Sequence, residues 1–154
     1  MGLDMYLDKE MYVGANWCRP EKISGEVTLK VGNVDFSKRI NPFKISRIVE
    51  MVGYWRKANQ IHRWFVENVQ DGEDDCGRYP VSGEQLAELL RIVKIVIANP
   101  DLAKELLPTK EGFFFGDTEY GDYYIEDLQN TVEILEGLDL SDNIEDTYYY
   151  HSSW

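Results

Sequence analysis

Cysteine is scarce in this sequence, with only Cys18 and Cys76 among 154 residues. The two lie far apart, form no CxxC pair, and have no histidine at zinc-finger spacing. A chain of this length buries enough surface to fold without disulfides or metals. We therefore expect free thiols, with no metal and no cofactor.

Long apolar runs and catalytic signatures are also missing. No stretch of about 18 apolar residues and no secretory leader is visible, which predicts a cytoplasmic protein without a membrane partner. The sequence contains no nucleophile elbow, phosphate loop, dinucleotide fingerprint or HExxH motif. These absences favour a protein that acts by binding over an enzyme.

Basic residues are sparse in the second half of the chain. Residues 1–66 hold 11 Lys and Arg against 7 Asp and Glu, whereas residues 67–154 hold 5 against 21, for a total net charge of −12. So acidic a half repels phosphate backbones and argues against direct nucleic-acid binding. Three interpretations remain: an acidic surface for a basic partner, a basic and aromatic site for a small anion, or acidity for solubility alone.

The patterns in the N-terminal part of the sequence, and at its C-terminal end, predict strands. Residues 5–13 and 26–31 show strand patterns and are separated by a loop over 14–25. Gly32-Asn33 favours a hairpin turn from the second strand into residues 34–40. Residues 147–154 read as a final strand that joins the N-terminal strands.

Helical periodicity fills most of the remainder. Asn41-Pro42 precedes an apolar stripe that predicts one long helix over 43–70, and Ser82 with Gln85 forms a capping box for a second. A short helix is expected up to Leu107, a buried strand at 113–115, and a helix over 123–136 that ends at Gly137. We predict one α+β domain over 1–154, in which a small, mostly antiparallel sheet packs against three to four helices.

Four blocks carry a family resemblance: MGLDMYL, YWRKANQIHRWFVENVQDGEDDC, ELLPTKEGFFFGDTEYGDYY and the closing SSW. Together they resemble a family of small proteins of phages, prophages and Firmicute bacteria. The resemblance implies a phage or mobile-element setting and hence the cytosol of a bacterial host. Many small proteins of that setting take over the host or counter its defences. The resemblance assigns no catalytic residue.

The segment 54-YWRKANQIHRWF-65 holds the main candidate ligand residues. On the expected helix, Asn59 and His62 share one side and either read a ligand in a pocket or belong to the core, with His62 bonded to a carbonyl or a tyrosine. Arg56 and Arg63 lie on the adjacent flank and could clamp one anionic group. Trp64 points away from His62, as a binding anchor or as part of a second packing layer.

Two acidic segments supply the other candidates. In 117-DTEYGDYY-124, Glu119 and Tyr120 could contribute acid-base chemistry and stacking, although acids also favour the start of a helix. The loop over 71–75 departs from the calcium-loop pattern, so we expect a solvated turn. The predicted partner-binding surface is acidic: Glu133, Glu136, Asp139, Asp142, Glu145 and Asp146.

The favoured hypothesis is an acidic inhibitor or modulator that binds a basic surface of a host protein. The first alternative is a pocket protein that sequesters or cleaves a small anionic ligand, such as a signalling nucleotide. The second is a structural or assembly protein that uses its aromatic surface as an oligomer interface.

Overall fold

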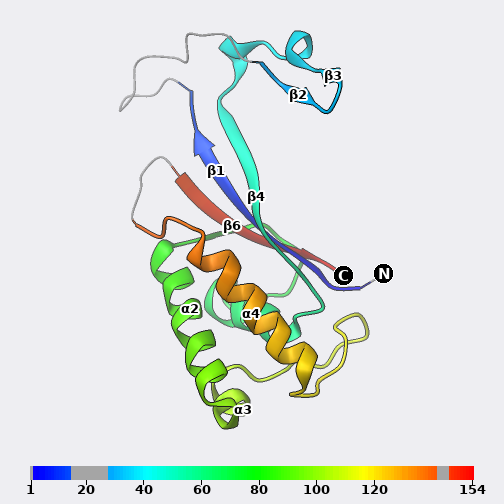
Figure 1. Ribbon diagram of the computed structural model, residues 1–154, viewed down its shortest axis with the longest axis vertical. Helices are drawn as coiled ribbons and strands as arrows, with labels where there is room; N and C mark the ends of the chain where they lie inside the picture. The colour runs from blue at the N-terminus through cyan, green and yellow to red at the C-terminus, as the bar shows by residue number, and fades with distance from the viewer. Residues whose placement is uncertain (1, 15–27, 142–145) are drawn as a thin grey trace.

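The computed structural model describes residues 2–14, 28–141 and 146–154. Within these ranges it has six strands and four α-helices, and Figure 1 shows how they are arranged. The strands are β1 (Asp4–Tyr12), β2 (Lys30–Val31), β3 (Val34–Asp35), β4 (Arg47–Arg56), β5 (Tyr79–Val81) and β6 (Asp146–Ser153). The α-helices are α1 (Asn59–Asn68), α2 (Gly83–Ala98), α3 (Ala103–Leu106) and α4 (Asp122–Glu136), and 3-10 turns cover Ser37–Arg39, Pro42–Lys44 and Pro100–Leu102.

The main sheet has four antiparallel strands in the order β4-β1-β6-β5. The N-terminal strand β1 lies at its centre and pairs with the C-terminal strand β6, with Tyr6 opposite His151. The predicted α+β class, with a C-terminal strand added to an N-terminal sheet and helices packed against it, is confirmed.

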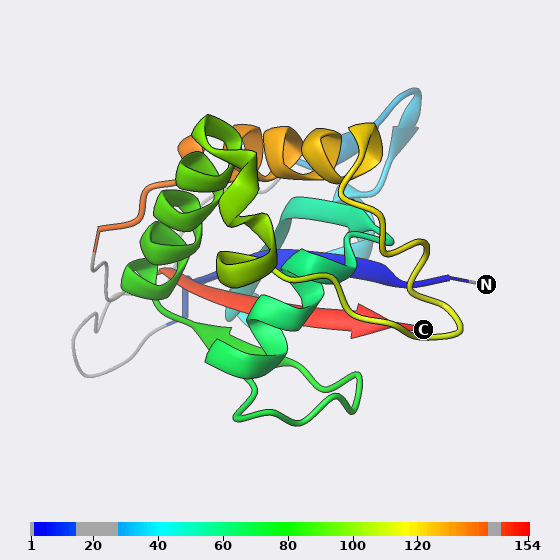
Figure 2. The same cartoon turned by 90° about the horizontal axis from the view of Figure 1, so that it is seen from below.

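One face of this sheet forms the core. Side chains alternate across a strand, so Met5 and Leu7 of β1 point to the same side as Trp55 of β4 and Tyr150 of β6, and all four are buried. Helices cover that face, and Figure 2 views the molecule from this helical end. The opposite face carries Tyr6, whose ring stacks on His151 at 4.8 Å between centroids.

The helices begin and pack largely as their sequence patterns indicate. The Ser82 side chain accepts a hydrogen bond from the backbone of Gln85, and the Gln85 side chain accepts one from the backbone of Ser82, so the predicted capping box is confirmed. Helix α4 packs on α2 and crosses β4 at Gly53, where an added Cβ would lie 2.9 Å from Ile134. None of the helices in the described ranges is long and apolar enough to span a membrane.

The predicted helix over 43–70 is wrong in its first half. Residues 47–56 form strand β4, paired with β1 at every position except Val52, and only residues 59–68 are helical. The segment RIVEMVGYWR is rich in β-branched and aromatic residues, which favour a strand. Its apolar residues fit both a helical and a strand period, and pairing with β1 selects the strand. Lys57, at φ 61°, separates strand from helix.

Three further strand predictions need correction. Of the strand predicted over 26–31, only Lys30–Val31 is a strand among the described residues 28–31, and all four of these residues are exposed. Residues 113–115 form a turn, with Phe113 96% exposed and only Phe115 buried. Strand β3 ends at Asp35, because the Asp35 carboxylate accepts from the backbone of Ser37 and a 3-10 turn follows. The short strand β5 was not predicted, and the expected loop over 14–25 lies almost wholly outside the described residues.

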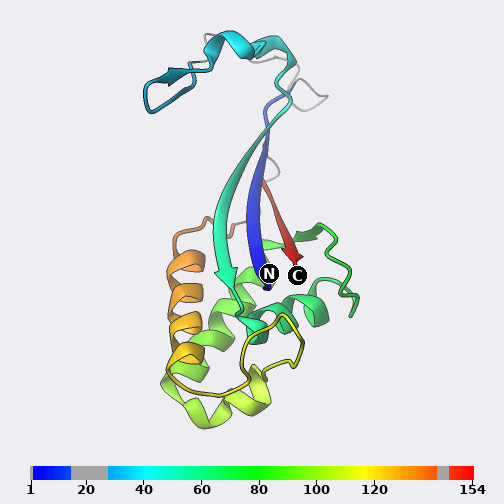
Figure 3. The same ribbon diagram turned by 90° about the vertical axis from the view of Figure 1, so that its right-hand side faces the viewer.

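The β4–β1–β6 part of the main sheet continues beyond the helices as a three-stranded ribbon, since β6 pairs with β1 as far as Met11. Figure 3 shows this ribbon and the β2–β3 hairpin projecting away from the helical end. We call residues 28–51 the arm. Its large apolar side chains are exposed, among them Val31 at 62% and Phe43 at 66%.

Candidate functional site

His62 is a core residue rather than a pocket residue. Its side chain is fully buried on α1, with Nδ1 2.7 Å from the Tyr150 hydroxyl and Nε2 3.1 Å from both carboxylate oxygens of Asp74. Of the two interpretations of His62, the core histidine bonded to a tyrosine matches this geometry. Asp74 also accepts from Lys110 at 2.9 Å and from the indole of Trp154 at 3.0 Å, so this network joins four distant segments.

The network fixes which ring nitrogen of His62 carries the proton. Burial lowers the pKa of the imidazole, which is therefore neutral at neutral pH. Burial alone would raise the pKa of Asp74, but hydrogen bonds and charge from Lys110 and His62 together lower it. Because a carboxylate only accepts, Nε2 carries the proton and Nδ1 accepts from Tyr150.

Asn59 holds a loop to the start of α1. Its amide nitrogen donates to the carbonyls of Phe115 at 3.1 Å and Asp117 at 2.8 Å, and its amide oxygen accepts from the backbone of Lys110 at 2.9 Å. With these bonds in place, the Asn59 side chain fixes the loop over 110–117 more directly than it could read a ligand.

That loop closes one side of a pocket of about 340 Å³. The end of β4, the start of α1 and the first turns of α4 form the other sides. Charged and amide side chains dominate its lining, including Arg56, Lys57, Gln60, Asp117, Glu119 and Asp127. The sequence-predicted residues Arg56, Asn59 and Glu119 thus lie at one site, although they come from β4, α1 and the loop ahead of α4.

Asp127 gives this pocket a titratable carboxyl. Burial is the main cause that raises the pKa of Asp127 from 3.8 to about 6. The hydrogen bond from Gln60 opposes this shift, whereas the charges of Asp117 and Glu126 add to it. The pocket therefore combines two cationic side chains with three carboxyl groups, and its charge does not single out an anion.

The remaining predicted ligand residues lie elsewhere. Arg63 pairs with Glu67 at 2.7 Å and does not share a helix flank with Arg56, which belongs to β4, so the proposed arginine clamp does not form. Trp64 is 6% exposed and packs against Phe65, as in its second-layer interpretation. The Tyr120 hydroxyl accepts from the backbone of Thr109 and orders the loop ahead of α4.

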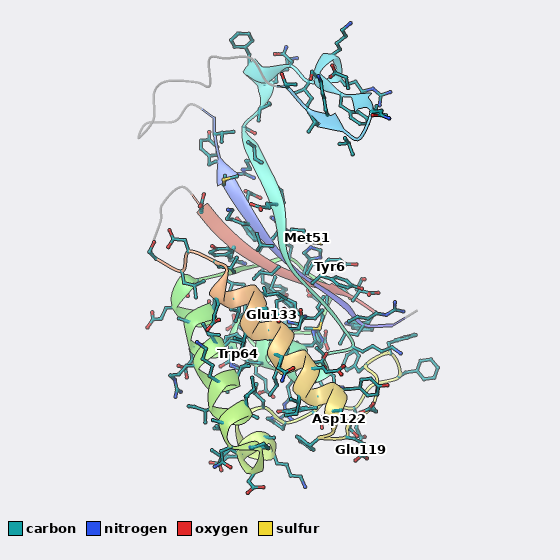
Figure 4. The ribbon with its side chains drawn as sticks, in the orientation of Figure 1. Tyr6, Met51, Trp64, Glu119, Asp122 and Glu133 are labelled. Carbon is teal, nitrogen blue, oxygen red and sulfur yellow. The ribbon has the colours of Figure 1, made fainter. Side chains whose placement is uncertain are left out.

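An acidic stripe runs along the solvent face of α4. Asp122, Glu126, Glu133 and Glu136 are all exposed and fall within about 80° of an ideal helical wheel. They span about 20 Å of helix axis. Figure 4 labels Asp122 and Glu133 along α4, with Glu119 just ahead of its first turn. No Lys or Arg follows Lys110 in the sequence, whereas residues 111–154 contain twelve Asp and Glu.

The predicted acidic surface is partly described by the structure. Glu133 belongs to the stripe, and so does Glu136, which pairs with Lys94 of α2 at 2.6 Å. Asp139 accepts from the backbone and hydroxyl of Ser141, and Asp146 begins β6. Asp142 and Glu145 lie outside the described residues.

Sequence reasoning missed several residues of these sites. Asp122 and Glu126 were not assigned to the acidic surface, although their spacing from Glu133 places all three on one side of a helix. Gln60, Lys57 and Asp127 of the pocket carried no sequence signal, because their proximity depends on how β4, α1 and α4 pack.

Comparisons of the sequence with protein families, with curated proteins and with solved structures found no match. In the described ranges, no three His, Cys, Asp or Glu side chains are grouped so as to hold a metal ion.

Proposed function

We propose that this chain is a phage or mobile-element accessory protein that acts by binding, with its acidic stripe occupying a basic surface of a host protein. The stripe on α4 carries the proposal: four exposed carboxylates along about 20 Å, in a stretch of chain without a basic residue.

The charge pattern favours recognition over solubility alone. Elsewhere on the surface acids are commonly interleaved with bases, as in the Arg91–Glu88 and Arg63–Glu67 pairs. Within the stripe only Glu136 has an ion-pair partner among the described residues. A surface of one sign attracts an oppositely charged groove and rejects like-charged ones. A basic groove that normally holds nucleic acid fits this chemistry, and its blockage would inhibit the host protein.

The test is affinity capture from a bacterial host lysate. The wild-type protein is compared with a stripe variant, Glu126→Lys/Glu133→Lys, and with a control variant, Glu105→Lys/Glu111→Lys, which has the same charge change at exposed positions off the stripe. We expect the wild type and the control variant to retain the same host proteins. The stripe variant should retain at least several-fold less of them. Equal retention by all three would refute the proposal.

The pocket beside Asp127 supports a second candidate function, the binding or turnover of a small ligand. The raised pKa of Asp127 in a lined cavity is the specific observation that favours it. A ligand with an anionic group for Arg56 and a cationic or donor group for Asp127 fits the lining better than a simple anion. Thermal unfolding against nucleotides and amine-bearing metabolites tests it, and a shift that Asp127→Asn removes is the expected result.

A further inference from the structure

The arm gathers most of the exposed apolar side chains. Of the eleven large hydrophobic residues exposed in the described part of the chain, seven lie in residues 29–51: Leu29, Val31, Val34, Phe43, Ile48, Val49 and Met51. Within the arm, the β2–β3 hairpin is a two-stranded sheet of its own, which is marginally stable in water, and an exposed apolar patch of this kind marks an interaction site. The arm is therefore an element whose exposed apolar side chains can bind a partner surface.

The charge of the arm is opposite to that of the rest of the molecule. Residues 28–51 contain five Lys or Arg and two Asp or Glu, a net charge of +3, whereas the whole chain has a net charge of −12. The partner surface must therefore be apolar and acidic at once.

Such a surface exists on the helical end. A groove of about 410 Å³ runs between α2 and α4, lined by Ile97, Ala98 and Val132 together with Lys94, Gln129 and Glu133. The lining holds one acid, Glu133, and one base, Lys94, so the negative charge beside these apolar contacts comes from the rest of the acidic stripe on α4. We call it the α2–α4 groove.

We infer that the arm of one copy docks on the α2–α4 groove of a second copy. Charge excludes the simplest alternative, because arm-to-arm contact would place +3 against +3, whereas arm-to-groove contact pairs the arm with the stripe. Docking within one chain is disfavoured because the ribbon directs the arm away from the helical end (Figure 3).

The inference shares the acidic stripe with the proposed function, so the two need separable tests. An arm variant, Val31→Ser/Phe43→Ser, leaves the stripe intact and changes only exposed side chains. A groove variant, Ala98→Arg, fills the groove at an exposed position near the end of α2, where a cation also suits the helix. Phe113→Ser is the control, since it removes an exposed phenyl ring away from both surfaces.

The experiment is sedimentation equilibrium of the purified full chain over a range of concentrations and salt. We expect the average mass of the wild type and of Phe113→Ser to rise from 17.9 kDa towards twice that value, and to fall with added salt. The arm and groove variants should each stay monomeric. An equimolar mixture of the two should regain association, because it restores one intact arm and one intact groove.

Three results would overturn the inference. They are a wild-type mass that stays at 17.9 kDa throughout, an arm variant that associates as strongly as Phe113→Ser, and a mixture that remains monomeric when the wild type does not. In lysate capture, the arm variant should still retain the partners of the stripe, which separates failure of this inference from failure of the proposed function.

Discussion

His62 shows how a single buried polar residue can organise distant parts of a chain. Its two ring nitrogens connect α1 to β6 through Tyr150 and to the acidic loop through Asp74. Asp74 in turn receives Lys110 and Trp154, so the C-terminus is fastened to the same point. A polar centre of this kind stabilises the fold only while each member keeps its partner.

Removing His62 should therefore destabilise the protein without touching a surface. We expect His62→Ala to lower the free energy of unfolding by about 1–3 kcal/mol, because the Tyr150 hydroxyl and Asp74 lose a buried partner. Urea unfolding measures this. Its neighbour Arg63 is the control, and Arg63→Ala should change stability by less than about 0.5 kcal/mol, as expected for an exposed ion pair.

Asp127 should leave a signature in the pH dependence of stability. Its folded-state pKa of about 6 exceeds its ordinary value of 3.8, so its contribution to stability is complete below about pH 4 and disappears as the pH rises through about 6. This corresponds to at most about 3 kcal/mol. Asp127→Asn should remove that decline and be more stable than the wild type at pH 7. A parallel pH profile for the two proteins would contradict the assignment.

For single residues, the sequence predicted some of the roles but not the partners that fulfil them. The tyrosine-bonded His62 and the second-layer Trp64 were both among the interpretations that the sequence allowed. The identity of the tyrosine was not predicted, because Tyr150 lies 88 residues from His62, on β6. Asp74 was not predicted as a partner because its loop was expected to be a solvated turn.

Among the helices and strands, β4 is an element that the sequence predicted wrongly, as the first half of a helix. Its apolar residues fit a helical stripe on paper, yet the segment pairs with β1 over nine positions and shifts register once, after Leu7. That long-range pairing has no local signal, whereas the capping box of α2 and the glycine end of α4 are local and were predicted correctly.

Gly53 marks the point where α4 crosses β4, and it should tolerate no side chain. An added Cβ would lie 2.9 Å from Ile134 and 3.2 Å from Leu7, so Gly53→Ala should cost about 1–3 kcal/mol through overpacking. Gly121, at the start of α4, has no atom within 4 Å of the corresponding position. Gly121→Ala should therefore be far milder in thermal unfolding. Equal losses in the two variants would mean that the crossing of α4 over β4 is not tightly packed.

Opposite charge at opposite ends characterises the molecule as a whole. The arm is basic and apolar, whereas the segment from Glu111 onward contains only acidic ionisable side chains apart from its tyrosines and His151. The asymmetry of the two halves was visible in the sequence. That the arm and the stripe occupy separate ends was not, because it follows from the course of the long strands β1 and β4 (Figure 1).

Repulsion among the acidic groups should be measurable in the protein alone. At a net charge of −12, raising NaCl from about 0.02 to 0.2 M should raise the melting temperature by several degrees, because screening weakens repulsion in the folded state. The less acidic stripe variant, Glu126→Lys/Glu133→Lys, should gain less. A melting temperature that falls with salt would indicate that attractive pairs outweigh repulsion.

The central claim is that the acidic stripe binds a basic surface that otherwise holds nucleic acid. The most direct measurement is competition: a host protein captured by the wild type is loaded with fluorescent nucleic acid and titrated with wild-type or stripe-variant protein. The account predicts that the wild type displaces the nucleic acid and that Glu126→Lys/Glu133→Lys displaces it far more weakly. Displacement of equal strength by the two proteins, or a complex that keeps its nucleic acid, would contradict the account.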